Sequence, residues 1–250
     1  MKKIALITGA TSGIGKATAE LFAQHQIDLI LCGRRQERLA ELAMQLSQSV
    51  KVYTLCFDVR DKEEVFRQIE NLPTDWKQID VLVNNAGNAH GLAPVDKADL
   101  VDWEAMIDIN VKGLMYVSKA VIPSMVERKS GHIINIGSIA GKEVYPNGNA
   151  YCASKYAVDA LNSGMRLDLV QYGIKVTAIN PGLVETEFSL VRFKGDEQRA
   201  KNVYKGITPL TAQDVAEVIY FAVSRPAHVN IADVILFPTA QASSTVVNRV

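Results

Sequence analysis

The stretch Thr8-Gly9-Ala10-Thr11-Ser12-Gly13-Ile14-Gly15 decides the fold of this 250-residue chain. It follows a short apolar run, Ile4–Thr8, which predicts a strand. It also opens a segment with helical spacing of apolar residues, Gly13–Gln24. A glycine-rich turn between the first strand and the first helix is typical of folds that bind dinucleotides. The spacing differs from G-x-G-x-x-G, so the prediction depends on the position of the turn as much as on its glycines.

The glycines of this turn have separate jobs in the predicted site. Gly9 permits the tight turn from strand to helix, Gly13 lets the backbone approach a pyrophosphate, and Gly15 lets the helix pack close to the sheet. The free N–H groups at the helix N-terminus then face the phosphates. The predicted cofactor-binding residues of the turn are Gly9, Thr11, Ser12, Gly13, Ile14 and Gly15. A purely structural turn is the alternative.

Strands and helices are expected to alternate along the whole chain. The expected strands are Ile4–Thr8, Asp28–Cys32, Lys51–Phe57, Asp80–Asn84, His132–Ile136, Lys175–Asn180 and Val229–Phe237. The expected helices are Gly13–Gln24, Gln36–Leu46, Lys62–Leu72, two within Val101–Val126, Ala150–Tyr172 and Asp214–Ala222. Apolar strands without alternation are typical of parallel sheets that are covered on both faces. The pattern predicts a single α/β domain over residues 1–250, a Rossmann-type doubly wound parallel sheet of about seven strands.

One segment, residues 185–208, does not fit this alternation. It is too long and polar for a tight connection, and it contains Arg192-Phe193-Lys194-Gly195. We expect it to form a lid over the substrate. An ordinary surface insertion is the alternative.

Composition excludes several classes of protein. Lys+Arg and Asp+Glu both number 27, which argues against a nucleic-acid-binding protein. The sequence has no apolar run of the ~20 residues that span a bilayer, and Ile4–Ile7 is too short for the core of a signal peptide. The three cysteines form no CxxC and the four histidines no HxxxH, so neither a disulfide framework nor a metal site is expected. A cytoplasmic protein without a membrane partner is expected.

The residues after the second expected strand indicate which dinucleotide is bound. An NAD-binding fold usually places Asp or Glu there to bond the ribose 2′-hydroxyl. This sequence has Gly33-Arg34-Arg35 instead, with no acid before Glu37. Guanidinium groups suit a 2′-phosphate, so Arg34 and Arg35 predict NADP as the cofactor. A pair of solvated arginines at the start of a helix is the alternative.

Ser138, Tyr151 and Lys155 are the candidate catalytic residues. Tyr151 and Lys155 are four residues apart on one expected helix, and therefore share a face. A free phenol has a pKa of ~10, and a nearby ammonium would lower that pKa toward the working range of a general base. Ser138 could hold the substrate oxygen while Tyr151 exchanges a proton. Isolated Tyr-xxx-Lys pairs are common on helix surfaces, so the assignment depends on the upstream serine and the glycine turn.

With these motifs the chain resembles the short-chain dehydrogenase/reductase family over essentially its whole length. The matching residues are Thr8–Gly15, Asp58-Val59, Asn84-Asn85-Ala86-Gly87, Asn110, Ser138, Tyr151-xxx-Lys155, Pro181-Gly182 and Thr186. The resemblance implies further roles. Asp58 and Val59 would hold the adenine, and Lys155 would also bond the nicotinamide ribose. Asn110 would support a water in a proton relay. The other implied cofactor contacts are Tyr151, Asn85, Ala86, Gly87, Pro181, Gly182, Val184 and Thr186.

A narrower resemblance lies in the variable part of the chain. Residues 187–196 and 226–231 are similar to the NADP-dependent 3-hydroxy acid dehydrogenases, including serine and L-allo-threonine dehydrogenases. This resemblance implies a small hydroxy acid or ketone as substrate, with Ser138 and Arg192 as substrate-binding residues, and a homotetramer. Arg192 could equally be a solvated or inter-subunit charge.

Two other functions compete with this one. A broad carbonyl or ketoester reductase that uses NADPH would need the same catalytic residues. A dinucleotide-binding scaffold without activity would be expected to lack Ser138, Tyr151 or Lys155, and all three are present.

Overall fold

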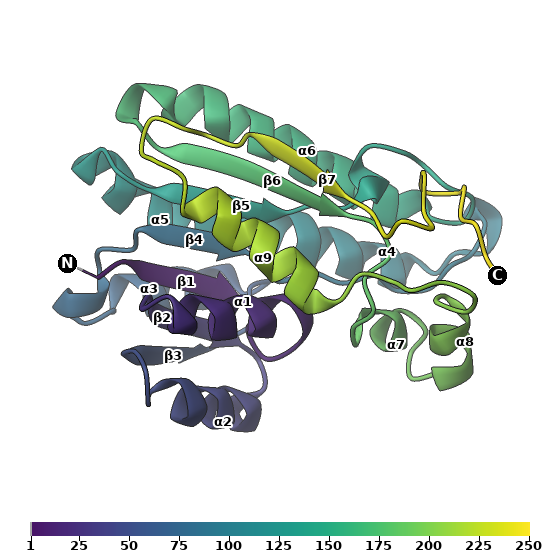
Figure 1. The fold of residues 1–250 in the computed structure, drawn as a ribbon, viewed down its shortest axis with the longest axis horizontal. Helices are drawn as coiled ribbons and strands as arrows, with labels where there is room; N and C mark the ends of the chain where they lie inside the picture. The colour runs from purple at the N-terminus through teal and green to yellow at the C-terminus, as the bar shows by residue number, and fades with distance from the viewer. Residues whose placement is uncertain (1) are drawn as a thin grey trace.

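A parallel sheet of seven strands forms the centre of the molecule (Figure 1). The computed structural model describes residues 2–250. The strands lie in the order β3-β2-β1-β4-β5-β6-β7. Their bounds are β1 Ile4–Thr8, β2 Asp28–Gly33, β3 Val52–Cys56, β4 Val81–Asn84, β5 His132–Ile136, β6 Lys175–Pro181 and β7 Asp233–Leu236.

The order of the strands reverses beside β1. The chain runs outward from β1 to β3 and then returns to pair β4 with the other side of β1. In doubly wound sheets the carboxyl ends of the strands at such a switch point are where ligands bind. The glycine turn follows β1, so it lies at this point.

Helices cover both faces of the sheet. The bounds are α1 Gly13–Gln24, α2 Gln36–Leu46, α3 Lys62–Glu70, α4 Leu100–Ile107, α5 Leu114–Arg128, α6 Asn149–Leu169, α7 Phe188–Arg192, α8 Glu197–Asn202 and α9 Ala212–Val223. In Figure 1, α1 and α9 cross the near face of the sheet, while α7 and α8 lie beyond the carboxyl ends of the strands. No helix within residues 2–250 is both long and apolar enough to cross a membrane.

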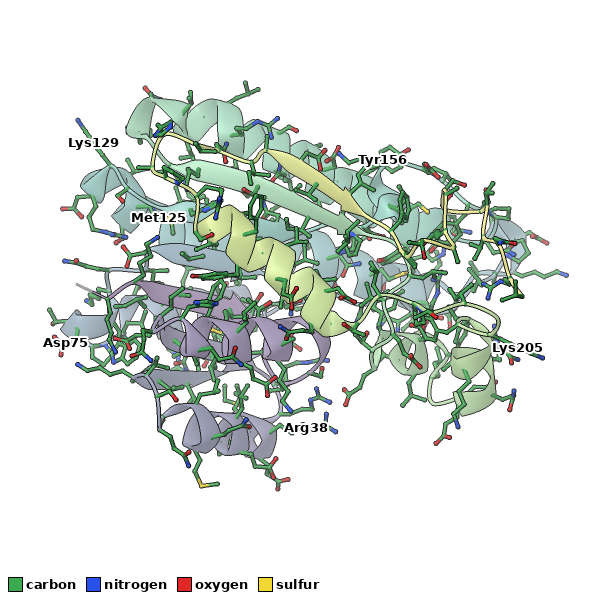
Figure 2. All side chains as sticks on the ribbon, viewed as in Figure 1. Arg38, Asp75, Met125, Lys129, Tyr156 and Lys205 are labelled. Carbon is green, nitrogen blue, oxygen red and sulfur yellow. The ribbon has the colours of Figure 1, made fainter. Side chains whose placement is uncertain are left out.

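The two hydrophobic cores follow from the alternation of side chains along buried strands. Ala5 and Ile7 of β1 face the core under α1, α2 and α9. Leu6, between them, faces the core under α3, α5 and the end of α6. Met125 of α5 belongs to this second core and is fully buried (Figure 2). Strands that are buried on both faces in this way explain why the sequence shows apolar runs rather than alternation.

The elements differ from the sequence expectations mainly at their ends. The last strand is four residues, Asp233–Leu236, and not Val229–Phe237, because its pairing with β6 begins only at Ala178 and Asp233. The two helices expected within Val101–Val126 are α4 and α5, joined by a π-helical turn, Asp108–Gly113. The expected irregular segment 185–208 contains the short helices α7 and α8.

Candidate active site

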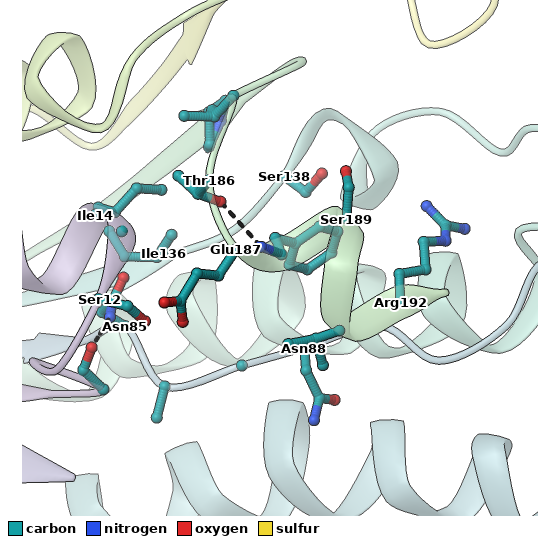
Figure 3. A pocket seen from close by; sticks show the side chains of 18 of the residues that line it. Ser12, Ile14, Asn85, Asn88, Ile136, Ser138, Thr186, Glu187, Ser189 and Arg192 are labelled. Atoms are coloured by element: carbon teal, nitrogen blue, oxygen red, sulfur yellow. Dashed lines mark hydrogen bonds between the residues drawn. The ribbon is translucent and has the colours of Figure 1, made fainter. Parts of the chain in front are cut away.

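A cavity of about 460 Å³ lies at the carboxyl ends of the strands. It runs from the glycine turn to α7 (Figure 3). All but two of the residues predicted from the sequence line it. These are Gly9, Thr11, Ser12, Gly13, Ile14, Arg34, Arg35, Asp58, Val59, Asn85, Ala86, Gly87, Ser138, Tyr151, Lys155, Pro181, Gly182, Val184, Thr186 and Arg192. The exceptions are Gly15 and Asn110, and both lie directly behind residues that do line the cavity.

The glycine turn fits a phosphate group. Gly9 and Gly13 have φ angles of 66° and 51°, which strain any side chain. Ser12 is the N-cap residue of α1, and its side chain makes no capping hydrogen bond, so the N-terminus of α1 is left for a ligand. A methyl group on Gly15 would collide with the Gly9 carbonyl oxygen and the Asn85 amide. Gly15 therefore serves close packing, as the sequence predicts.

Arg34 and Asp58 line the cavity where the chain leaves β2 and β3. Arg34 Nη1 lies 3.3 Å from Asp58 Oδ2, and Arg60 Nη2 lies 2.7 Å from the same oxygen. Burial raises the pKa of the Asp58 carboxyl, but the hydrogen bonds from Arg60 and the charges of both arginines outweigh burial and lower it. Asp58 is therefore ionised at neutral pH. The Arg34 side chain is 55% exposed, so its guanidinium is open to an incoming anion.

Arg35 has a different environment from Arg34. Its Nε and Nη2 donate to Thr11 Oγ1 at 3.1 and 3.0 Å, and its Nη1 donates to Glu187 Oε2 at 2.9 Å. Arg38 Nη1 donates to the other Glu187 oxygen at 2.7 Å. Arg35 thus joins the glycine turn to the residue just before α7. The sequence gives the two neighbouring arginines one role, whereas the structure gives them two different sets of partners.

Tyr151 and Lys155 lie on one face of α6, and both line the cavity with Ser138. Lys155 is 7% exposed, and its Nζ donates to the Ile136 carbonyl oxygen at 3.0 Å. Burial lowers the pKa of Lys155 to about 8. Lys155 therefore loses its proton at a lower pH than a solvent-exposed lysine does.

The expected effect of Lys155 on the Tyr151 phenol is not found in this structure. Lys155 Nζ is 6.0 Å from the centre of the Tyr151 ring, and its donor bond goes to Ile136. Burial raises the pKa of Tyr151, and a hydrogen bond with Ser138 and the charge of Arg192 offset only part of that rise. Tyr151 is therefore a protonated phenol at neutral pH. Burial of the phenol is the larger effect in this structure, and the lowering of the Tyr151 pKa by Lys155 stays a prediction.

Asn110 lies behind the cavity wall, in the π-helical turn between α4 and α5. Its Oδ1 accepts from the Asn88 backbone N–H at 2.8 Å, and its Nδ2 donates to the Asn88 carbonyl oxygen at 2.8 Å and to Ser154 Oγ at 3.0 Å. The side chain is 2% exposed. Asn110 therefore fixes the loop after β4 that carries Asn88 along the cavity.

Arg192, at the end of α7, reaches the end of the cavity that contains Tyr151. Its Nε donates to the Gly91 carbonyl oxygen at 3.1 Å, and its Nη2 donates to Tyr145 Oη at 3.0 Å. The guanidinium carbon lies 5.5 Å from the centre of the Tyr151 ring. Figure 3 shows Glu187 and Arg192 extending in opposite directions from the two ends of α7. The segment thus contacts Arg35 beside the glycine turn through Glu187, and it approaches Tyr151 through Arg192.

Sequence reasoning missed several residues of the site. Tyr145, Phe188 and Ser189 line the cavity near Tyr151, and Glu187 lines it near Arg35. The ring centres of Phe188 and Tyr151 are 5.7 Å apart. Glu187, Phe188 and Ser189 belong to the segment 187–196, whose resemblance to the 3-hydroxy acid dehydrogenases was the available signal, whereas no motif marks the loop residue Tyr145.

Fold and site together define an oxidoreductase with a dinucleotide cleft and a Ser-Tyr-Lys set. The chain belongs to the short chain dehydrogenase family, whose model matches residues 3–196. It is 47% identical over 245 residues to sulfoacetaldehyde reductase 2 of Chromohalobacter salexigens, covering 98% of this chain and 97% of the relative. It is 47% identical over 239 residues to the NADP-dependent 3-hydroxy acid dehydrogenase YdfG of Salmonella typhi, covering 95% and 96%.

A solved structure is similar over nearly the whole chain. The closed form of a serine dehydrogenase complexed with NADP+ matches with a TM-score of 0.93 and 46% identity, covering 96% of this chain and 97% of that one. The family and the Rossmann-type fold predicted from the sequence are thereby confirmed.

Proposed function

We propose that this protein is an NADP-dependent oxidoreductase acting on small β-hydroxy anions. By this term we mean alcohols in which one carbon stands between the hydroxyl-bearing carbon and the carbon or sulfur of an anionic group. The observation that carries the proposal is the position of Arg192, whose guanidinium lies beside the Tyr151 ring at the same end of the cavity. A cation at that place suits a substrate with an anion near its reacting carbon.

Three names among the relatives support this substrate class. In a 3-hydroxy acid, in serine and in sulfoacetaldehyde, one carbon separates the reacting carbon from the anionic group. The anion is a carboxylate in two of them and a sulfonate in the third. Their common feature is the distance between the reacting carbon and the negative charge, which Arg192 would recognise.

NADP is the proposed cofactor. The exposed Arg34 side chain follows β2, where a 2′-phosphate would need a cation. Among the described residues, Asp58 is the one carboxylate that pairs with Arg34. Two of the relatives are described with NADP or NADP+. Asp58 and Val59 are the proposed adenine contacts. The residues of Asn85–Gly87 are proposed to line the cofactor, and those of Pro181–Thr186 to flank the nicotinamide.

The chemistry follows from the protonation states at the site. The nicotinamide, when bound, supplies or accepts the hydride. Tyr151 is a neutral phenol, so in reduction it donates its proton to the oxygen that becomes the alcohol. Ser138 holds that oxygen by hydrogen bonding, and Lys155, when it is protonated, favours the phenolate that Tyr151 leaves behind. In oxidation Tyr151 takes the proton back.

The experiment that tests the proposal compares anionic and neutral substrates. Wild-type enzyme should reduce NADP with 3-hydroxypropanoate and serine far better than with an uncharged alcohol of the same length. Arg192→Ala should lower kcat/KM for the anionic substrates by about ten- to hundredfold, the cost of one charged hydrogen bond, and spare the neutral one. Tyr151→Phe is the inactive control that should still bind NADP. Equal activity on neutral ketones would instead indicate a broad carbonyl reductase.

Three further features belong to this proposal. Residues 185–208 form the lid of the site, carried by α7 and α8. The protein works as a homotetramer, which is supported by exposed apolar side chains such as Leu167 of α6 and Ile235 of β7. It works in the cytoplasm, which is supported by the free thiols of its three cysteines. Light scattering of the purified protein tests the assembly.

A further inference from the structure

Tyr145 is a loop residue between β5 and α6 that no motif singles out. Its ring lies against Gly148, where any side chain would collide with it. It also packs against the apolar cluster that contains Tyr151 and Met106. The ring is therefore held on the body of the protein and not on the lid.

The Tyr145 hydroxyl has one hydrogen-bond partner among the described residues. Arg192 Nη2 donates to Tyr145 Oη at 3.0 Å, and the guanidinium carbon lies 5.6 Å from the Tyr145 ring centre. Burial raises the pKa of Tyr145, and the charge of Arg192 offsets only part of this rise, so the phenol keeps its proton at neutral pH. Within residues 2–250, that hydroxyl hydrogen has no acceptor. It is available to a group inside the cavity.

Arg192 has unused donors at the same place. Its Nε and Nη2 bond to Gly91 and Tyr145, which leaves Nη1 without a partner among the described residues. Both Tyr145 and Arg192 line the cavity beside Tyr151. A hydroxyl and a guanidinium nitrogen, one on the body and one on the lid, are thus together at the substrate end of the site.

We propose that Tyr145 is a substrate-specificity residue, whose phenol donates a hydrogen bond to the anionic group of the substrate while it orients Arg192. The inference deepens the proposed function and rests on it. A carboxylate or a sulfonate has oxygens enough to accept from both residues at once. A neutral substrate gains nothing from the second donor.

The test is Tyr145→Phe, which keeps the ring on Gly148 and removes only the hydroxyl. We expect kcat/KM for 3-hydroxypropanoate to fall about tenfold or more, mainly through KM, and kcat/KM for its methyl ester to change less than about twofold. The matched control is Tyr156→Phe, because the Tyr156 hydroxyl donates to the Lys142 carbonyl oxygen on the exposed side of α6, outside the cavity (Figure 2). It should leave both substrates unchanged.

A double mutant separates direct contact from an effect through Arg192. In the Arg192→Ala background, Tyr145→Phe should still lower kcat/KM for 3-hydroxypropanoate several-fold. No further loss in that background would mean that Tyr145 acts only by orienting Arg192, and would overturn the inference. An equal loss for the acid and the ester would overturn it as well.

Inhibition by malonate distinguishes failure of this inference from failure of the proposed function. Malonate is an unreactive anion, and its inhibition of the reduction of a neutral aldehyde reports anion binding without turnover of a hydroxy acid. Tyr145→Phe should raise the inhibition constant about tenfold. If no β-hydroxy anion is a substrate, the proposed function fails, and an unchanged inhibition constant would then show that Tyr145 fails too.

Discussion

At the scale of single residues, Lys155 combines a catalytic position with a cost to stability. Its ammonium is buried with one carbonyl partner, and burial lowers its pKa from 10.5 to about 8. Below pH 8 the lysine is charged in both the folded and the unfolded state, so the folded state bears the full cost of burying the charge. As the pH rises from 8 to 10.5, the folded protein carries the neutral amine and the cost disappears.

Lys155→Met should therefore stabilise the cofactor-free protein while it abolishes turnover. The gain in the free energy of unfolding should be about 3 kcal/mol below pH 8 and should shrink as the pH approaches 10.5. Denaturant unfolding at pH values on both sides of 8 measures it. The same substitution at Lys119, exposed on α5, is the matched control. A gain that does not vary with pH would contradict the assignment of the cost to a buried charge.

Substitutions of Arg34 and of Arg35 should have different effects on the choice between NADP and NAD. Arg34→Ala should raise the KM for NADP by about ten- to hundredfold and leave the KM for NAD nearly unchanged, because it removes one charged donor to the 2′-phosphate. Arg35→Ala should weaken both cofactors, because Arg35 braces Thr11 in the glycine turn. Titration of each variant with NADP and NAD gives the four values. If both variants raised the KM for NADP equally and left the KM for NAD unchanged, both arginines would bind the 2′-phosphate.

At the scale of elements, α7 is fastened at both ends. Glu187, just before it, accepts from Arg35 and Arg38. Arg192, at its end, exchanges backbone and side-chain hydrogen bonds with Gly91. Lys194 follows α7, and its Nζ lies 2.9 Å from Oδ1 of Asp102 in α4. These contacts join the segment to two separate parts of the protein.

Removing the Glu187 carboxylate should loosen the cofactor side of this segment. Its ion pairs are partly exposed, each worth about 1 kcal/mol or less, so Glu187→Gln should speed dissociation of NADPH and NADH alike by about three- to tenfold. Stopped-flow fluorescence measures both rates, and Glu104→Gln is the control, because Glu104 is exposed on α4 and forms no ion pair among the described residues. Selectively tighter binding of NADPH would show that Glu187 competes with the 2′-phosphate and does not close the site.

At the scale of the whole molecule, the sequence predicts what depends on local pattern. Buried parallel strands such as Ile4–Thr8 are visible as apolar runs, and the glycine turn is visible because its chemistry requires glycine at fixed spacing. The substrate end is different. Tyr145 and Arg192 are 47 residues apart in the chain, and Arg35 and Glu187 are 152 apart. Such pairs depend on how loops meet at the sheet edge, and no local pattern encodes that meeting.

The same distinction applies to protonation. The Tyr151–Lys155 spacing correctly predicts two neighbours on one face of a helix, yet the direction of the Tyr151 pKa shift depends on burial among side chains such as Tyr145 and Phe188. Burial of a side chain is a property of the assembled molecule.

The double attachment of α7 makes the two ligands thermodynamically dependent on each other. In the proposed complex one ligand would lie near each end of this short helix, and whatever favours the fastened position at one end would favour it at the other. Linkage requires the coupling to be reciprocal: the factor by which the nucleotide tightens the hydroxy anion is the factor by which the anion tightens the nucleotide. A cell rich in the substrate would thereby hold more of this enzyme in its nucleotide-bound form, without any separate regulatory site.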